Sequence, residues 1–188
     1  MSSEVPAAVP AKEHPSVRHM LKTAMTLFKL RVVSLADHDN ISRLLKDPAV
    51  MRFIGLEAGR IPSDGEIRSH VQRAVSVWRT RGWGRWSVFE RDTGDFVGFC
   101  GFRSEEGTPE LVSVVHEKYW GLGYATEASA AVLDYGFNRL HFTEVCAYAR
   151  PANERALALL DNLNAEYIGL VDFHGVEGAA YILRPGDI

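Results

Sequence analysis

Residues 116–128, HEKYWGLGYATEA, join a predicted strand to a predicted helix through a turn that contains Gly121 and Gly123. Glycine suits such a turn because it has no Cβ and tolerates positive φ. The first N–H groups of the following helix have no acceptor inside that helix, and the helix dipole adds positive potential there. The stretch therefore predicts a site for a phosphate or diphosphate, although a glycine pair also occurs in ordinary turns.

Two common phosphate-binding motifs do not fit this stretch. A Walker loop requires GK[ST] at its end, whereas Gly123 is followed by Tyr124-Ala125. The dinucleotide fingerprint requires a third glycine where this chain has Thr126. Glu144 is spaced as a ribose-binding acid would be, but it stands where the next predicted strand begins and not where it ends.

Hydrophobic periodicity outside this stretch predicts a mixed α/β fold, with a sheet of about seven strands and about four helices on its faces. Ser63 and Glu66 form a capping box, and Gly82 follows the helix that begins there. Asp37 or Asp39 is predicted to cap an earlier helix. The predicted strands are 27–33, 83–90, 96–102, 110–116, 144–149, 167–172 and 179–183; the helices run up to Leu45 and over 63–82, 126–140 and 153–163, with one further turn at 49–53.

Length and composition indicate one globular domain, residues 26–188, after a flexible tail at residues 1–25 that is rich in Ala, Pro and Ser. The net charge of −3 argues against nucleic-acid binding and against a polybasic membrane surface. No apolar run is long enough to span a bilayer, and the first residues do not resemble a signal peptide. Cys100 and Cys146 show no CxxC spacing, so we expect free thiols and a cytoplasmic location.

The segment 118–128, KYWGLGYATEA, resembles the acetyl-coenzyme A loop of GNAT-type N-acetyltransferases, most closely the branch of the Rim-type enzymes that acetylate ribosomal-protein N-termini. The resemblance extends from about Leu30 to Leu183 and includes Leu30-Arg31 and the segments 47–51, 97–102 and 153–156. It implies a GNAT-like central twisted mixed β-sheet, with acetyl-CoA as the cosubstrate.

The same resemblance implies the residues that hold the coenzyme. The loop backbone would cradle the diphosphate, the edge of the fourth strand would pair with the pantetheine amides, and a residue of the last helix would reach the pantetheine. The acceptor amine would enter from the opposite side, near Phe53–Gly55, the fourth strand and the turn Phe173–Glu177. The implied coenzyme-binding set is Val114, Val115, His116, Gly121, Leu122, Gly123, Tyr124, Ala125, Thr126 and Asn153.

Two side chains on the fourth predicted strand are candidates for a catalytic base. Glu110 could act directly or through water, and His116 lies on the same strand face and titrates in a suitable range. A solvated carboxylate, an ion pair or a polar strand end would explain the same residues without catalysis. Ala156 and Leu160 stand where the family often has Ser and a Tyr acid. The histidine spacings show no metal motif, so no metal is predicted.

The chemistry of direct attack favours an α-amine as the acceptor. An α-amine is neutral for about a tenth of the time at pH 7, whereas a lysine side chain is neutral about 0.04% of the time. We therefore expect a primary amine acceptor, with a protein N-terminus fitting best. A small-molecule acceptor (a polyamine, amino acid or aminoglycoside) and a non-catalytic CoA-binding module remain as alternatives. A homodimer is common in the family resembled, but no residue of this sequence indicates one.

Overall fold

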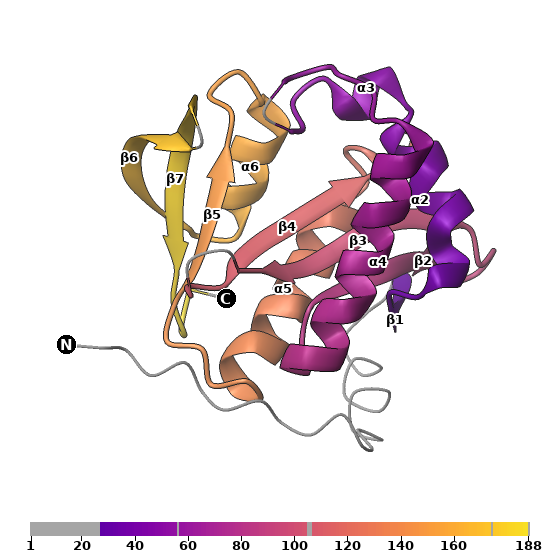
Figure 1. Ribbon diagram of the computed structural model, residues 1–188. Coiled ribbons are helices and arrows are strands. Elements are labelled where there is room, and N and C mark those ends of the chain that lie inside the picture. Colours follow the sequence, from indigo (N-terminus) through magenta and orange to yellow (C-terminus); the bar gives the residue numbers. More distant parts are fainter. Residues whose placement is uncertain (1–26, 56, 105–106, 174, 188) are drawn as a thin grey trace.

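The computed structural model describes residues 27–55, 57–104, 107–173 and 175–187; the predicted tail and His174 lie outside them. In the described part of the chain, seven strands form one mixed sheet in the order β1-β2-β3-β4-β5-β7-β6 (Figure 1). The predicted fold class and number of strands are confirmed. The strands are β1 Phe28–Val32, β2 Arg85–Glu90, β3 Phe96–Arg103, β4 Glu110–Val115, β5 Val145–Ala149, β6 Glu166–Phe173 and β7 Val176–Leu183.

Five α-helices and two 3₁₀ turns accompany the sheet within these described ranges. The helix beyond the four expected is α3, which has four residues and was predicted as a single turn. The 3₁₀ turns η1 and η2 were not predicted. The helical elements are η1 Leu35–Asp37, α2 His38–Leu45, α3 Pro48–Met51, α4 Asp64–Arg81, η2 Glu117–Tyr119, α5 Tyr124–Asn138 and α6 Glu154–Asn162.

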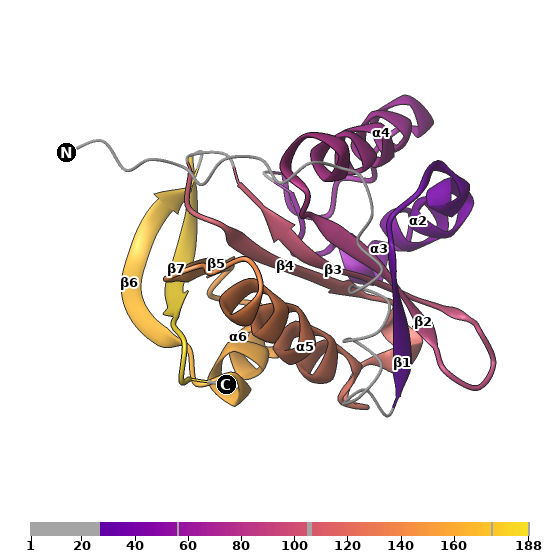
Figure 2. The same cartoon turned by 90° about the horizontal axis from the view of Figure 1, so that it is seen from below.

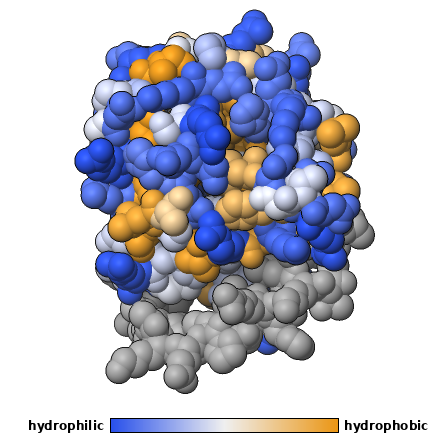
Figure 3. Space-filling model, turned by 90° about the vertical axis from the view of Figure 1, so that its right-hand side faces the viewer, coloured by the Kyte–Doolittle hydropathy of each residue, from blue (hydrophilic) through white to orange (hydrophobic). Residues whose placement is uncertain are grey.

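The helices cover the sheet on both faces. Figure 2 shows α5 and α6 on one face, and α2, α3 and α4 on the other. Each face has its own hydrophobic cluster: Trp86, Phe102, Val132 and Leu183 belong to the one beneath α5, while Phe99 belongs to the one beneath α2 and α4. The face of the molecule in Figure 3 is mostly hydrophilic, with scattered hydrophobic patches.

The start of α4 confirms the predicted capping box. The Ser63 Oγ accepts the N–H of Glu66 at 3.4 Å, and the Glu66 carboxylate accepts the N–H of Ser63 at 2.8 Å. The helix ends at Gly82, whose φ of 72° is a left-handed conformation that glycine adopts without strain. None of the helices in the described ranges has the length and apolar character needed to cross a membrane.

The predicted capping role of Asp37 is only half right. Asp37 occupies the N-cap position of α2, but its side chain makes no capping hydrogen bond there. Its fully buried carboxylate instead accepts the Ser34 N–H at 2.8 Å and the Ser87 hydroxyl at 2.9 Å, and it pairs with Arg31. A buried carboxylate must be satisfied by donors, and here those donors come from β1, β2 and the segment between β1 and η1.

Candidate active site

The loop between β4 and α5 ends in a helix N-terminus with no side-chain cap. Gly123 is the N-cap of α5, and the first backbone bond within the helix runs from the Glu127 N–H to the Gly123 carbonyl at 3.0 Å. The N–H groups of Tyr124, Ala125 and Thr126 precede that bond, so none has an acceptor inside the helix. Three donors and the positive end of a 15-residue helix therefore converge at one point.

Both glycines of the loop have a left-handed backbone. Gly121 has φ 73° and Gly123 has φ 84°, which disfavours any residue with a Cβ. A Cβ on Gly121 would meet no protein atom within 4 Å, so the space beside it is open. Leu122 between them is 58% exposed. The predicted loop residues 121–126 are thus brought together around an accessible patch of backbone.

β4 and β5 form a splayed pair. They are parallel neighbours, yet only one pair of residues, Glu110 and Cys146, is in register between them. Beyond that pair the two strands diverge, as the arrows in Figure 1 show. On its other side β4 pairs with β3 along its whole length. The loop before α5 follows the open end of β4, so the gap between the strands leads to the cluster of free N–H groups.

Strand register decides which residues of β4 face this gap. The His116 N–H donates to the Val97 carbonyl at 2.8 Å, and Val114 lies opposite Phe99. Alternate residues of an antiparallel strand direct their main-chain groups to the same neighbour. The backbones of Val114 and His116 therefore face β3, whereas those of Ser113 and Val115 face β5. Ser113 was missing from the predicted set, because the register of β4 against β3 decides which alternate residues face the gap.

Trp120 occupies the open end of the gap. Its indole N–H donates to the Val115 carbonyl at 2.8 Å, and the guanidinium of Arg155 lies over its ring at 4.3 Å. Asn153, on the same side of the gap as α6, caps that helix by accepting the Ala156 N–H at 3.3 Å. The amide nitrogen of Asn153 is the part of its side chain that is left to contact a ligand.

Glu110, the first predicted base, lies at the closed end of the gap. It is 7% exposed, and its Oε1 accepts a hydrogen bond from Arg103 at 2.6 Å. Arg103 is its register partner on β3. Leu160, where the family often has a tyrosine acid, is buried in the core beneath α5.

His116, the second predicted base, lies at the open end of β4. The imidazole Nδ1 is buried without a hydrogen-bond partner in the part of the chain that the structure describes, and it lies 3.9 Å from the Asp47 carboxylate. Asp47 in turn accepts the Ala49 N–H at 2.9 Å as the N-cap of α3. The imidazole is thus set between β4 and the start of α3, and α3 leads to the predicted acceptor segment Phe53–Gly55.

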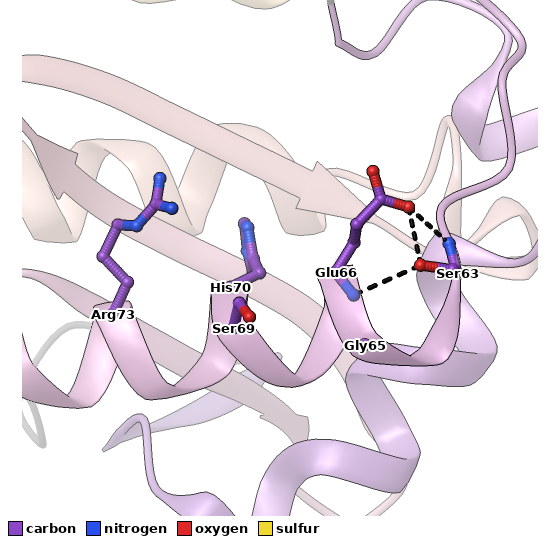
Figure 4. A pocket seen from close by; sticks show the side chains of 6 residues that line it. All are labelled: Ser63, Gly65, Glu66, Ser69, His70 and Arg73. Atoms are coloured by element: carbon purple, nitrogen blue, oxygen red, sulfur yellow. Dashed lines mark hydrogen bonds between the residues drawn. The ribbon is translucent and has the colours of Figure 1, made fainter.

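The acceptor side of the gap is bounded by α4 and by the loop after α3. Arg150, directly after β5, donates to the Gly55 carbonyl at 2.7 Å and ties this loop to the far side of the gap. Gly55 also lines a pocket of about 360 Å³ that includes Met51, Ile54 and His70. Figure 4 shows the adjoining pocket of about 500 Å³, where Ser63, Glu66, His70 and Arg73 project from the same side of α4.

His70 was not predicted as a site residue. Its Nε2 lies 2.6 Å from Arg85 NH1, and its ring lies 5.9 Å from that of Phe99. Burial, with the charges of Arg85, Arg73 and Arg103, lowers the pKa of His70 to about 4. Its contacts come from β2 and β3 and could not be predicted from the sequence around it. In the described ranges, no group of three or more His, Cys, Asp or Glu side chains is arranged to hold a metal ion.

Comparison with known proteins identifies the family that has this arrangement of a splayed sheet beside an uncapped helix N-terminus. The family model described as "Acetyltransferase (GNAT) domain" matches residues 28–166, and the chain belongs to that family. It is an acyltransferase by this membership. The uncharacterized N-acetyltransferase p20 of Bacillus licheniformis is 27% identical over 79% of this chain and 85% of its own. YkkB of Bacillus subtilis is 28% identical over 78% and 87%.

Solved structures share the fold at lower sequence identity. An acetyltransferase from Agrobacterium tumefaciens superposes with a TM-score of 0.73 at 21% identity, covering 84% of this chain and 91% of its own. RimL, a ribosomal L7/L12 α-N-protein acetyltransferase in complex with coenzyme A, has a TM-score of 0.73 at 17% identity over 86% and 96%. A ribosomal-protein-S5-alanine acetyltransferase from Vibrio fischeri has 0.71 at 11% over 87% and 96%. The predicted resemblance to GNAT enzymes is confirmed.

Proposed function

We propose that this protein transfers the acetyl group of acetyl-CoA to a primary amine, and that its preferred acceptor is the α-amine of a protein N-terminus. The observation that carries the proposal is the uncapped N-terminus of α5 beside the splay of β4 and β5. The N–H groups of Tyr124, Ala125 and Thr126 would hold the diphosphate. Gly121 and Gly123 leave the backbone accessible to it.

The pantetheine arm would lie along the edge of β4. The backbones of Ser113 and Val115 face the gap, so they offer the N–H and C=O groups that a pantetheine amide can pair with. The Val115 carbonyl already accepts the Trp120 indole N–H but retains a second lone pair. The amide nitrogen of Asn153 would approach from the opposite side. Val114 and His116 would contact the arm through their side chains.

The reaction is the direct attack of a neutral amine on the thioester carbonyl. The C–N bond forms, the C–S bond breaks, and the proton lost by the amine nitrogen is matched by one gained by the departing thiolate. The Val115 N–H is the best-placed donor for the developing oxyanion. Holding the two reactants together supplies a large part of the rate. The α-amine is favoured because it is neutral far more often than a lysine side chain at pH 7.

Two residues can assist the loss of the amine proton. The buried Nδ1 of His116 makes no hydrogen bond to the described residues, and it lies 3.9 Å from the carboxylate of Asp47, which begins the α3 segment leading to the acceptor loop. Glu110 is held by Arg103 at the closed end of the gap and would act through water. His116 is the better placed of the two, because the Glu110 carboxylate is already engaged by Arg103.

The named structural relatives support an N-terminal acceptor. RimL is described as an α-N-protein acetyltransferase, and the V. fischeri enzyme as one for the alanine of ribosomal protein S5. The superposition covers 96% of each of these two chains. Under the alternative, a polyamine, an amino acid or an aminoglycoside would enter the same gap in place of a protein N-terminus.

Release of the CoA thiol tests both the reaction and the acceptor. Purified protein is given acetyl-CoA with a peptide that has a free α-amine, a peptide whose α-amine is blocked but which has a lysine, or spermidine. We expect the first peptide to be acetylated with the highest kcat/KM. A preference for spermidine or for the lysine peptide would contradict the α-amine proposal. No thiol release with any amine, despite CoA binding, would contradict catalysis.

A matched pair of loop variants tests the coenzyme site. Gly121→Val forces a branched residue into a left-handed backbone and fills the open space beside the loop. The Kd for CoA should therefore rise at least about tenfold, which corresponds to the loss of one charge-assisted contact. Leu122→Ala alters the exposed neighbour of the same loop and should bind CoA as the wild type does. If calorimetry gave equal affinities of the two variants for CoA, the proposal that this loop binds the diphosphate would be wrong.

A further inference from the structure

The pocket of about 360 Å³ on the acceptor side has an apolar floor. The floor comes from α2, α3, α4 and the loop that joins the last two, and its side chains are Leu45, Met51, Ile54, Pro62 and Ile67. Leu45, Met51 and Ile67 also belong to the buried cluster beneath α2 and α4, so packing fixes their positions. Pockets that bind ligands are lined mainly by apolar side chains, and this floor suits an apolar group.

The charged side chains on the rim of this pocket are engaged by one another. The guanidinium of Arg60 donates to the Glu66 carboxylate at 2.6 and 3.2 Å and pairs with Glu57 at 3.6 Å. Glu66 also accepts the N–H and the hydroxyl of Ser63, both at 2.8 Å. A charged ligand would have to compete with these contacts, whereas an apolar ligand leaves them intact. The rim therefore favours an apolar ligand.

His70 also lines the pocket, and its ring is neutral. The Nε2 atom lies 2.6 Å from a guanidinium nitrogen of Arg85, and a guanidinium can only donate, so Nε2 accepts this hydrogen bond. The pKa of His70 is lowered to about 4, mainly by burial, so the ring stays neutral at pH 7. The wall of the pocket at His70 therefore adds no charge to the apolar floor.

The segment that walls the pocket lies beside both strands of the gap. α3 begins at Asp47, whose carboxylate lies 3.9 Å from the His116 imidazole at the open end of β4. The loop after α3 reaches Gly55, whose carbonyl accepts a hydrogen bond from Arg150, the residue after β5, at 2.7 Å. In Figure 1, α3 lies at the end of the molecule towards which β4 and β5 point. Since Gly55 also lines the pocket, the pocket and the gap share a wall.

We propose that this pocket receives the side chain of the first residue of the acceptor, so that the protein prefers N-termini that begin with a large apolar residue such as leucine or methionine. The inference rests on the proposed function and names the substrate class of the same site. The first side chain branches from the carbon that bears the attacking nitrogen, so it lies beside the gap when the amine reaches the thioester. A long apolar side chain removes more surface from water on this floor than a methyl group does.

The test uses peptides that differ only in the first residue. Peptides with a free α-amine begin with leucine, asparagine, alanine or serine and are otherwise identical; leucine and asparagine have nearly the same shape. A second series keeps alanine first and places leucine or alanine second. We expect kcat/KM for the peptide with leucine first to exceed that for each of the others at least about tenfold, as a hydrophobic pocket gives for added methylene groups.

A matched pair of isoleucine variants assigns the preference to the pocket. Ile54→Ala shortens a half-buried side chain that lines the pocket, and it should reduce the ratio of kcat/KM between the leucine and alanine peptides at least about threefold. Ile61→Ala changes an exposed isoleucine of the same loop that lines neither pocket, and it should keep the wild-type ratio. Both variants should bind CoA with the wild-type Kd, which shows that they are folded.

The outcomes separate the inference from the proposed function. Equal kcat/KM for the leucine and alanine peptides, or equal ratios in the two variants, would overturn the inference and leave the proposed function intact. A preference for leucine at the second position would overturn the assignment of the pocket to the first side chain. The wild-type peptide series decides the preference even if Ile54→Ala does not fold. No acetylation of any peptide, despite CoA binding, would overturn the proposed function itself.

Discussion

The two sides of β4 are built differently. Towards β3 the strand is paired in register from Glu110 to Val115, and the β1–β2 and β2–β3 ladders continue that pairing to the edge of the sheet. Towards β5 it is paired only at Glu110. Backbone groups that leave a ladder must find other partners, and here the Val115 carbonyl finds the Trp120 indole. The closed part, β1 to β4, is therefore paired strand by strand, whereas the gap leaves backbone groups of β4 open to a ligand.

Asp37 offers the strongest test of the closed part. Asp37→Ala removes a fully buried acceptor of three hydrogen bonds from Ser34 and Ser87 and the partner of Arg31. We expect a loss of about 4 kcal/mol in the free energy of unfolding, measured with urea, and an unchanged Kd for CoA in the folded fraction. Asp39→Ala, with a 91% exposed side chain, is the control and should cost less than about 0.5 kcal/mol. A higher Kd for CoA in Asp37→Ala would show that the closed part of the sheet and the gap are energetically coupled.

Proline substitutions on adjacent residues of β4 test the division directly. Val114→Pro removes an N–H that faces β3 and should cost about 3 kcal/mol of stability. Ser113→Pro removes an N–H that faces the gap, so it should cost less stability but weaken CoA binding about tenfold. Urea unfolding and calorimetry give both values. Equal losses of stability, or the larger loss of CoA affinity in Val114→Pro, would refute the assignment of faces.

His70 makes the stability of the protein depend on pH. The pKa of His70 is about 4 in the folded chain, because of burial first and then Arg85, Arg73 and Arg103, and about 6.5 when unfolded. The unfolded state therefore binds the proton first as the pH falls, so stability is present above pH 6.5 and is lost between pH 6.5 and 4. We expect a loss of about 2 kcal/mol across that window.

The variant His70→Gln isolates this contribution, since it keeps an acceptor for Arg85 but does not titrate. Its free energy of unfolding should change less than that of the wild type between pH 6.5 and 4. Parallel pH profiles for the wild type and His70→Gln would mean that His70 does not titrate in this window.

Trp120 gives the smallest expected effect. Trp120→Phe keeps a ring beneath Arg155 but removes the N–H that pairs with the Val115 carbonyl, which should cost about 1 kcal/mol of stability. Saturating CoA should stabilise the variant more than the wild type, because a pantetheine amide can replace the lost donor. Thermal shifts with and without CoA measure both changes. If CoA stabilised the variant and the wild type by the same amount, the pantetheine would not contact the Val115 carbonyl.

Local signals in the sequence were sufficient to predict most of the fold. The capping box of Ser63 and Glu66, Gly82 after the helix and the glycines of the loop all act within a few residues, and the structure has each of them in its expected place. The predicted strands 83–90 and 96–102 likewise pair as the antiparallel β2 and β3. These features depend on local backbone geometry, which the sequence specifies directly.

Features that depend on register or on distant contacts were not accessible in this way. Asp37 could be assigned to a helix start, but its bond to Ser87 joins residues fifty positions apart. Whether Ser113 or Val114 faces the gap follows from the contact between His116 and Val97. The hydrogen bond between His70 on α4 and Arg85 on β2 joins two elements that are distant along the sequence. The ion pair of Arg103 and Glu110 is an exception, since hairpin register alone would have placed them opposite each other.

The tryptophans are divided between the two regions. Trp78, Trp83 and Trp86 contact other aromatic rings in the closed part of the sheet, while Trp120 lies at the open end of the gap with a guanidinium on its face. Replacing three of them with phenylalanine would leave an intrinsic fluorophore whose emission reports occupancy of the gap. Titrating that emission with CoA would give dissociation constants and binding rates without a label or a coupled assay.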